Sequence, residues 1–470
     1  MSEIILRIAV PSPLFRHFDY LPPASMDVSA LQPGVRVRVP FGRRRAVGVL
    51  LDVCSESDID RARLKPALAI LDAEPVIHAD VLDMMLWASA YYHHPVGECL
   101  GTALPALLRS GQALPEVRPA GWRLTPAGGE IDITALTRAP RQATVMQALQ
   151  QHPAGVARAE LDTTAATLKT LQDKRWIEPC VIESPAGDAA PPVDIPHTLN
   201  PSQQAAVNAI CAGLDQYHPF LLEGVTGSGK TEVYLQAIAA VIDSGRQTLV
   251  LVPEIGLTPQ LVERFRRRFP VLIAVLHSGL ADRERLLAWQ QARSGEAAVI
   301  IGTRSAIFTP LAHPGLLIID EEHDSSLKQQ EGLRYSARDL AVWRARRLDI
   351  PVVLGSATPS LESLFNVEQQ RYRHLVLPER TGTAQLPEFS IIDVCKQPLE
   401  QGLSRALLNR MRRHLEADGQ VLLFLNRRGF APTLICHECG WVAECQRCDA
   451  RMTLHQRDRE LRCHHCGSQR

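Results

Sequence analysis

An eight-residue segment has the residue types and spacing of a phosphate-binding loop. It consists of Gly224, Val225, Thr226, Gly227, Ser228, Gly229, Lys230 and Thr231. Apolar residues 220–222 precede it and a helical pattern from Glu232 to Val241 follows, so the segment joins a predicted strand to a predicted helix. Glycines let backbone N–H groups surround a polyphosphate, while Lys230 can reach the β- and γ-phosphates and the Thr231 hydroxyl can hold Mg²⁺. The segment predicts a site for a nucleotide polyphosphate with Mg²⁺.

Acidic residues follow a second apolar run. Leu316–Ile319 has the pattern of a buried parallel strand, and Asp320, Glu321, Glu322 and His323 come directly after it. Asp320 can bind Mg²⁺ through water, and Glu321 can orient and deprotonate a water that attacks a γ-phosphate. An acidic loop after a core strand has the same pattern. The phosphate-binding loop upstream favours the catalytic interpretation.

Three other predicted strands end in small or hydroxyl-bearing residues. These strands are residues 248–252, 298–301 and 352–354. Because ligands of parallel sheets bind beyond the carboxyl ends of the strands, the residues that follow them share an edge with the phosphate-binding loop. Hydroxyls and backbone amides suit a phosphodiester backbone, which is bound without sequence preference. The residues expected to contact DNA there are Pro253, Thr303, Arg304 and Ser356.

Six of the eleven cysteines lie in the last thirty-five residues. They form three pairs with the same spacing: Cys436 and Cys439, Cys445 and Cys448, Cys463 and Cys466. Two residues between the members of a pair let two thiolates bind one tetrahedral Zn²⁺. Disulfides are the weaker interpretation, because a reducing compartment keeps thiols free.

The number of cysteines is enough for one complete four-sulfur zinc site but not for two. The inner quartet, from Cys445 to Cys466, has the spacing of a zinc ribbon. Cys436 and Cys439 then need another pair of ligands, for which His464 or His465 is the weaker candidate. We expect one fully liganded Zn²⁺ in this chain and two in a complete protein.

Composition restricts the class of protein without deciding its partner. The chain has 470 residues, which suggests roughly three or four domains. Lys and Arg total 51 and Asp and Glu total 51, so any surface for nucleic acid must come from local clustering of charge. Because no apolar run approaches the length of a membrane span, and the N-terminus lacks a signal-peptide layout, we expect a cytoplasmic protein without a membrane partner.

Two smaller domains are predicted before the phosphate-binding loop. Residues 4–10, 36–39 and 46–53 are typical of short strands separated by Pro and Gly turns, so the chain is expected to be all-β before Asp58. Residues 141–183 have the pattern helix, short helix, helix, hairpin, which is typical of a winged helix. Its third helix, near residues 163–174, carries few positive charges, so a docking surface and a DNA contact are both open.

Together these motifs resemble those of superfamily 2 helicases, with residues 320–323 as a DEAH-like box and residues 356–358 as the coupling motif. Within that superfamily the whole chain is similar to the PriA family of primosomal replication-restart helicases. The cysteine module after residues 423–430, the stretch 325–332 and the N-terminal region carry this resemblance. It implies that ATP is the nucleotide, that Lys230, Asp320 and Glu321 are catalytic, and that Gln203 binds adenine.

The resemblance also implies a DNA site in the N-terminal region. In the family, a Phe-Asp-Tyr segment forms a pocket for the 3′ end of the leading strand at a fork. Phe18 and Tyr20 are then expected to stack on a base while Asp19 meets its polar edge. Gly34 and the basic run of residues 43–45 are further candidates for DNA binding.

Two departures from the family pattern limit what the resemblance implies. Leu327 and Leu333 stand where the family has aromatic residues, and only Tyr335 remains, so we expect weaker base stacking by this loop and weaker stimulation of ATP hydrolysis by DNA. The second lobe, which supplies an arginine to the γ-phosphate in such motors, begins at residues 420–430 and is not completed before Arg470. We therefore expect a chain truncated at its C-terminal side.

The predicted fold is a multidomain α/β protein. A β-rich domain that binds 3′ ends of DNA is expected at residues 1–110, a winged helix with its linker at 111–190, and a RecA-like helicase lobe with a parallel sheet at 191–380. The start of a second lobe with the cysteine-rich zinc module is expected at 381–470.

The function expected from the resemblance is that of an ATP-dependent 3′-to-5′ DNA helicase that recognises stalled or repaired forks and initiates primosome assembly. Its expected partners are forked and single-stranded DNA, single-stranded-DNA-binding protein and the proteins that load the replicative helicase, within the nucleoid. One alternative is a fork-recognition and docking platform in which ATP acts as a switch without unwinding by this chain. Another is an unrelated ATPase with a zinc ribbon, which would not share the N-terminal Phe-Asp-Tyr segment.

Overall fold

The computed structural model describes most of the chain and divides it into two units, residues 1–383 and 384–470. The described residues are 4–23, 31–114, 121–131, 133, 136, 139–153, 155–157, 161, 163–180, 194, 196–381, 388–394, 396–424, 434–436, 438–455 and 460–470. No helix among these residues has the length and apolar character needed to cross a bilayer.

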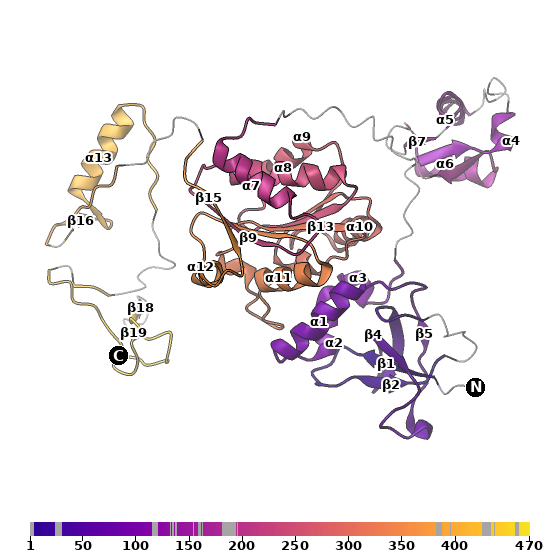
Figure 1. Ribbon diagram of the computed structural model, residues 1–470, viewed down its shortest axis with the longest axis horizontal. Coiled ribbons are helices and arrows are strands. Elements are labelled where there is room, and N and C mark those ends of the chain that lie inside the picture. Colours follow the sequence, from indigo (N-terminus) through magenta and orange to yellow (C-terminus); the bar gives the residue numbers. More distant parts are fainter. Residues whose placement is uncertain are drawn as a thin grey trace. The chain divides into compact units, whose positions relative to one another are not determined.

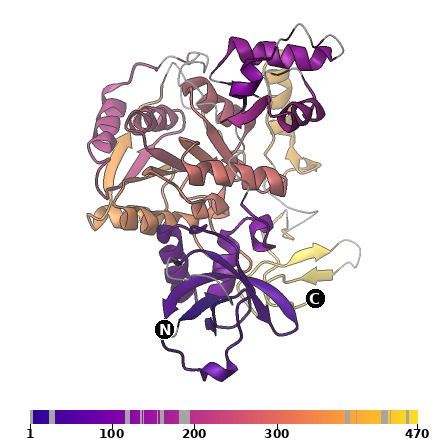
Figure 2. The same cartoon turned by 90° about the vertical axis from the view of Figure 1, so that its right-hand side faces the viewer.

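The N-terminal domain contains a five-stranded antiparallel sheet in the order β2-β1-β4-β3-β5 (Figures 1 and 2). Its strands are β1 (Ile5–Ala9), β2 (Phe18–Tyr20), β3 (Arg36–Phe41), β4 (Arg44–Cys54) and β5 (Ala69–Ile70). The single-turn helix η1 (Arg61–Arg63) follows β4, and the helices α1 (Ala79–Tyr91), α2 (Val96–Ala103) and α3 (Ala106–Arg109) follow the sheet. The three strands predicted from sequence are confirmed, whereas β2 and β5 are too short to give a clear alternating pattern.

The helicase lobe is built on a seven-stranded parallel sheet in the order β11-β12-β10-β13-β14-β9-β15. Its strands are β9 (Pro219–Gly224), β10 (Gln247–Leu251), β11 (Ile273–Leu276), β12 (Val299–Gly302), β13 (Pro314–Ile319), β14 (Val352–Ser356) and β15 (Arg373–Leu377). Its helices are α7 (Pro201–Cys211), α8 (Lys230–Asp243), α9 (Pro259–Arg268), α10 (Asp282–Ser294), α11 (Ala337–Leu348) and α12 (Leu361–Glu368), with the short turns η3 (Arg304–Phe308) and η4 (Ser325–Leu327). The predicted RecA-like parallel sheet is confirmed.

Helices cover both faces of this sheet, which explains why its strands are apolar without interruption (Figure 1). Along β13, Leu316 and Ile318 pack with α7, α8 and α9, whereas Leu317 and Ile319 pack with α10 and α11. Successive side chains of a strand point to opposite faces, so each strand serves both halves of the core. The sheet therefore brings the loops after β9, β13 and β14 to one rigid edge.

Helix α1 of the N-terminal domain packs against α11 of the helicase lobe. The rings of Trp87 and Trp343 stack with centroids 5.7 Å apart. Arg344, which is fully buried, forms an ion pair with Asp80 at 2.8 Å and donates to the Ile307 carbonyl. One apolar cluster is continuous across this contact, so the N-terminal domain and the helicase lobe share a core.

Residues 121–180 form a separate small α/β arrangement. Its elements are β6 (Gly121–Leu124), α4 (Pro126–Gly129), α5 (Pro140–Gln151), β7 (Val156–Ala157), α6 (Ala165–Asp173) and β8 (Ile177–Cys180), with the sheet order β7-β6-β8. The third helix of the predicted winged helix corresponds to α6. Ile177–Cys180 forms β8, which pairs with the upstream strand β6, and the rest of the predicted hairpin, residues 181–183, lies outside the described residues. The expected linker at residues 187–192 lies outside the described residues.

The second unit contains less regular structure in its described residues. Its elements are β16 (Leu399–Glu400), β17 (Leu403–Ser404), α13 (Arg405–Glu416), β18 (Thr453–His455) and β19 (Glu460–Arg462). Residues 421–424, the start of the predicted second lobe, form no strand, and Leu422 is 93% exposed. The continuation of that segment, residues 425–430, lies outside the described residues.

Candidate functional site: a nucleotide cavity and a DNA-facing edge

The phosphate-binding loop connects β9 to α8, as the sequence predicts. Gly227 and Gly229 have φ angles of 82° and 83°, a backbone conformation that favours glycine. Gly229 is also the N-cap of α8, so the loop ends where the free N–H groups of a helix begin. The Lys230 Nζ donates to the Gly224 carbonyl at 2.8 Å. Lys230 is therefore held beside the loop that a polyphosphate would enter.

Gln203 lies in α7 and supports this loop from behind. Its Nε2 donates to the Ser228 carbonyl at 2.8 Å and its Oε1 accepts from the Asn200 N–H at 2.9 Å. A Cβ atom on Gly229 would lie 2.4 Å from the Gln203 Nε2, so the glycine allows this close approach. Gln203 is 3% exposed, and both ends of its amide are hydrogen-bonded within the protein. The structure therefore shows it supporting the phosphate-binding loop, in addition to the adenine contact that the family resemblance implies.

The loop opens into a cavity of about 760 Å³. Asp320 and Glu321 enter it from the end of β13, opposite Lys230 and Thr231. The rest of the lining consists of Asp194, His197, Thr198, Gln203, Thr226, Gly227, Ser228, Gly229, Glu232, Leu235, Arg264, Arg268 and Thr381. The predicted phosphate-binding and catalytic residues thus share one cavity, although about ninety residues separate them in the sequence.

Asp320 is held by a residue that the sequence analysis did not single out. The Tyr234 hydroxyl on α8 donates to the Asp320 Oδ1 at 3.0 Å. Burial raises the pKa of Asp320 and the Glu321 carboxylate raises it further, whereas the hydrogen bond from Tyr234 and the charge of Lys230 lower it. Tyr234 is 2% exposed, and a Cβ on Gly355 of β14 would lie 1.5 Å from its hydroxyl. Glycine at position 355 is thus required for this arrangement.

Glu321 has an unusual backbone conformation. Its φ is 45°, in the left-handed region that non-glycine residues seldom occupy. Such strain persists where the surrounding structure enforces it, which is common at functional sites. The Glu321 side chain is 40% exposed and lines the cavity, so its carboxylate is accessible to a water molecule.

Glu322, the next residue, has a structural role. Its carboxylate accepts hydrogen bonds from the Ser360 N–H at 2.7 Å and from the Ser363 hydroxyl at 2.9 Å, and it pairs with Arg338 at 3.1 Å. Its side chain is fully buried. Glu322 therefore ties the end of β13 to the N-terminus of α12, and position in sequence alone did not distinguish it from the two acids before it.

His323 connects the DEAH-like box to the predicted coupling motif. Its Nδ1 lies 2.8 Å from the Ser356 Oγ and its Nε2 lies 3.4 Å from the Thr358 Oγ1. Ser356 is fully buried and also accepts from the Thr358 N–H. Because the Ser356 hydroxyl is buried and bonded within the protein, it is not accessible to DNA in this arrangement. Its contact with His323 supports the coupling role of this motif.

The expected DNA-binding edge is partly covered as well. Pro253 is buried and Thr303 is 4% exposed, whereas Ile255 beside Pro253 is 84% exposed. Arg304 donates from its Nη1 to the carbonyls of Ser326 at 2.8 Å and Lys328 at 3.1 Å. The guanidinium thus holds the loop that follows the DEAH-like box.

That loop does not present its apolar residues to a base. Leu327 and Leu333 are each 3% exposed, and Tyr335 is 2% exposed with its ring against Phe308. These positions belong to the core of the lobe, and the weaker stimulation of ATP hydrolysis by DNA stays a prediction. Lys328, in the same loop, lies over the ring of Tyr92 from the N-terminal domain at 4.9 Å.

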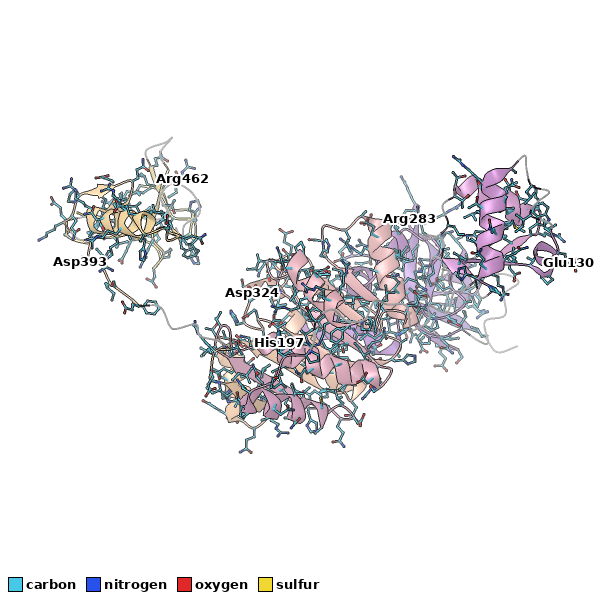
Figure 3. All side chains as sticks on the ribbon, turned by 90° about the horizontal axis from the view of Figure 1, so that it is seen from above. Glu130, His197, Arg283, Asp324, Asp393 and Arg462 are labelled. Atoms are coloured by element: carbon cyan, nitrogen blue, oxygen red, sulfur yellow. The ribbon has the colours of Figure 1, made fainter. Side chains whose placement is uncertain are left out.

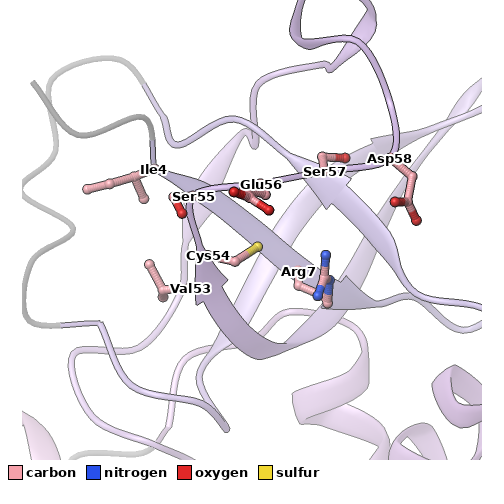
Figure 4. Close-up of a pocket in the computed structure, with 8 residues that line it drawn as sticks. All are labelled: Ile4, Arg7, Val53, Cys54, Ser55, Glu56, Ser57 and Asp58. Carbon is pink, nitrogen blue, oxygen red and sulfur yellow. The ribbon is translucent and has the colours of Figure 1, made fainter.

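In the N-terminal domain, Asp19 lies on the outer face of β2. It pairs with Arg7 of β1 at 3.2 Å, and its side chain is 7% exposed. Arg7 lines a cavity of about 680 Å³ beside this pair, with Cys54 and the loop of residues 55–58 (Figure 4). Arg7 thus links this cavity to the Asp19 carboxylate, which does not line the cavity itself.

The neighbours of Asp19 point to the opposite face. The ring of Phe18 is half-buried, packs edge-on against Phe41 and lies 5.0 Å from the Arg16 guanidinium. Tyr20 is 5% exposed, and its hydroxyl donates to the Pro40 carbonyl. Gly34 is buried, and a Cβ there would lie 2.2 Å from the Ile77 carbonyl oxygen. The structure therefore gives Tyr20 and Gly34 packing roles.

The basic run of residues 43–45 lies at the turn between β3 and β4. Arg43 and Arg44 are exposed, and Arg44 lies 5.7 Å from the Phe41 ring. This turn is the most basic part of the sheet. Phe41, which precedes the turn, contacts the ring of Phe18, so the turn and that ring lie close together.

The inner cysteine quartet comes together as the spacing predicts. The ligand atoms of Cys445, Cys448, Cys463 and Cys466 all lie within 4.8 Å of one another. A tetrahedral Zn²⁺ with Zn–S bonds of about 2.3 Å needs sulfurs about 3.8 Å apart, so the four thiols fit this ion. No other group of three or more candidate ligands occurs among the described residues, and Cys436 and Cys439 are not part of the quartet.

Comparisons with known proteins agree with this geometry. Residues 7–105 match the profile of the PriA 3′ DNA-binding domain, residues 200–367 that of DEAD/DEAH box helicases, and residues 445–470 that of the PriA Cys-rich region. The chain is 46% identical to the replication restart protein PriA of Haemophilus influenzae and 34% identical to that of Bacillus subtilis.

Each of these two alignments includes 99% of this chain, which corresponds to 64% of the Haemophilus protein and 67% of the Bacillus protein. The chain thus spans about two thirds of the length of these relatives. The profiles and identities also agree with the predicted resemblance at both ends of the chain. On these grounds the chain belongs to the PriA family of replication restart proteins.

Proposed function

We propose that this chain carries the nucleotide-driven and fork-recognising parts of a 3′-to-5′ DNA helicase that restarts replication at stalled or repaired forks. The observation that carries the proposal is the single cavity shared by Lys230, Thr231, Asp320 and Glu321. The N-terminal domain, which shares a core with that lobe, supports DNA as the substrate.

Each residue of the cavity has a role in ATP hydrolysis under this proposal. The loop amides and Lys230 hold the β- and γ-phosphates, and Thr231 and Asp320 hold the Mg²⁺ that neutralises charge on them. Glu321, exposed at the end of β13, orients the attacking water and accepts its proton. The contacts of His323 with Ser356 and Thr358 then couple the nucleotide bound in the cavity to the end of β14.

DNA recognition is assigned to two surfaces. Asp19 meets the nucleotide at the 3′ end of the leading strand, while the basic turn of residues 43–45 and the half-buried ring of Phe18, on the other face of β2, hold the DNA next to it. The loops after β10 and β12 hold the single strand on which the motor moves. The zinc ribbon binds a protein partner or helps to separate the duplex. The proposed partners are single-stranded-DNA-binding protein and primosome proteins. The proposed location is the nucleoid.

The alternative function is a fork-recognition and docking platform in which ATP binding acts as a switch without unwinding by this chain.

Hydrolysis of ATP by this 470-residue chain distinguishes the two functions. It is measured without DNA, with a single strand, and with a fork that carries a leading-strand 3′ end, and Lys230→Ala serves as the blank. Turnover stimulated by the fork supports the motor. Tight fork binding without turnover in any of the three conditions supports the platform.

A further inference from the structure

A small cavity lies where the N-terminal domain meets the helicase lobe, apart from the nucleotide site. Its volume is about 110 Å³. The N-terminal domain contributes residues 102–106 and Arg109 from the end of α2 and from α3. The lobe contributes the end of β11, two residues of α10 and the turn η3 after β12. The cavity is thus built by both domains.

The polar groups around the cavity favour an anion. Arg109 and Arg285 are its charged residues, and hydroxyls are supplied by Thr102, Ser305 and Thr309. No carboxylate lines it. Arg285 is anchored, because its Nη2 donates to the carbonyls of His277 and Ser278 at 3.0 Å each. A cation would meet two like charges here, whereas an anion meets two opposite charges and several donors.

The size and position of the cavity suit a phosphate group. Its volume of about 110 Å³ is sufficient for one. The cavity lies at the carboxyl ends of β11 and β12, and Thr303 and Arg304, two of the predicted DNA contacts, directly precede its Ser305. A phosphate in a continuous strand bound along this edge would lie within reach of it.

We propose that this cavity binds one backbone phosphate of the single DNA strand on which the lobe moves, through Arg109 and Arg285. This rests on the proposed function, because the strand must cross the edge of the lobe. Since Arg109 belongs to the N-terminal domain, the bound phosphate is held between the two domains and fixes the strand relative to both.

The test is binding of fluorescein-labelled oligothymidylate to the full chain, followed by anisotropy over a series of salt concentrations. Arg109→Ala is the main variant, because Arg109 is exposed and its loss should leave the fold intact. Arg283→Ala is the matched control, since Arg283 (Figure 3) precedes Arg285 on the same helix and is exposed.

We expect Arg109→Ala to bind DNA roughly ten-fold more weakly, as for the loss of one charged hydrogen bond. The slope of log K against log salt should fall by about 0.7, the value for one phosphate contact to a single strand. Arg283→Ala should match the original chain, and melting temperatures establish that all variants are folded.

Three outcomes would overturn the inference. The first is Arg109→Ala binding DNA like the original chain. The second is equal losses in Arg109→Ala and Arg283→Ala, which would indicate general charge alone. In the third, inorganic phosphate raises the melting temperature of the original chain but not of Arg109→Ala, while the two proteins bind DNA equally. The ligand of the cavity would then be free phosphate. Failure of the original chain to bind any DNA would instead contradict the proposed function.

Discussion

The Tyr234 hydroxyl donates a hydrogen bond to Asp320, and so fixes the carboxylate that faces the phosphate-binding loop. Tyr234 is on α8, the helix that begins with Lys230, so one helix carries both Lys230 and the partner of Asp320, the acid proposed to bind Mg²⁺. Burial raises the pKa of Tyr234, which keeps its hydroxyl protonated and able to donate. This buried hydrogen bond thus adds to the apolar packing between the helix and β13.

Removal of that hydroxyl should impair Mg²⁺ binding more than nucleotide binding. We expect Tyr234→Phe to raise the Mg²⁺ concentration needed for half-maximal binding of a fluorescent ATP analogue by roughly ten- to one hundred-fold, as for other residues that orient a metal ligand. Affinity for the analogue without Mg²⁺ should stay the same. Tyr217→Phe is the control. Tyr217 comes just before β9, and the phosphate-binding loop follows the other end of that strand. Equal effects of the two variants would contradict the positioning role.

Glu322 should stabilise the fold and take no direct part in chemistry. Glu322→Ala leaves Arg338 and two serines without their buried acceptor, so we expect a loss of roughly 3 kcal/mol in the free energy of unfolding. Urea denaturation measures it, with the exposed Glu331→Ala as the control. Loss of activity at full stability would show that Glu322 acts in catalysis instead.

Acid should weaken the contact between the N-terminal domain and the helicase lobe through His78. Burial lowers the pKa of His78, and the charges of Arg293 and Arg344 lower it further, while Asp80 and the Leu311 carbonyl oppose them. The unfolded chain therefore binds this proton more readily than the folded one. The stabilising contribution is present above the ordinary histidine pKa of about 6.5 and is lost as the pH falls below it.

This pH dependence is measured as the melting temperature between about pH 5 and 8. We expect His78→Asn to lose less stability on acidification than the original chain. His17→Asn, at an exposed histidine of the same domain, should behave like the original chain. Parallel curves for all three proteins would exclude His78 as the source.

The inner cysteine quartet should retain one Zn²⁺ by itself. We expect Cys463→Ser to lose one tightly bound Zn²⁺ per chain, because three sulfurs and water bind far more weakly than four sulfurs. Cys436→Ser should keep that ion, and Cys211→Ser, outside the module, serves as the control. A chromophoric chelator added to the unfolded protein counts the metal. Loss of the ion from Cys436→Ser would mean that the outer pair completes the site.

Asp19 should distinguish DNA ends by their chemistry. Its carboxylate can accept a hydrogen bond from a 3′-hydroxyl but repels a 3′-phosphate, so we expect Asp19→Asn to weaken binding of forks with a free 3′ end by roughly ten-fold. Binding of forks with a blocked end should change little. Asp52→Asn is the matched control, since Asp52 lies opposite Arg7 on the other neighbouring strand. Equal losses on both forks would exclude Asp19 from end recognition.

The sequence by itself determined those features whose signal is local. The phosphate-binding loop, the acids after β13 and the inner cysteine quartet each depend on residues close together in the chain, and their spacing corresponds to a defined geometry. The parallel sheet was predictable because strands buried on both faces are apolar without interruption.

Only the tertiary structure decided what each side chain contacts over a long distance. Nothing in the sequence pairs Tyr234 with Asp320, directs Glu322 toward Ser360, or places strand Ile177–Cys180 against Gly121–Leu124. Leu327 and Leu333 have the same sequence pattern whether they are exposed or buried, and it is the packing of their loop into the lobe that covers them. The small cavity with Arg109 and Trp289 exists only because two domains share a core, and the sequence of each domain alone contains no sign of it.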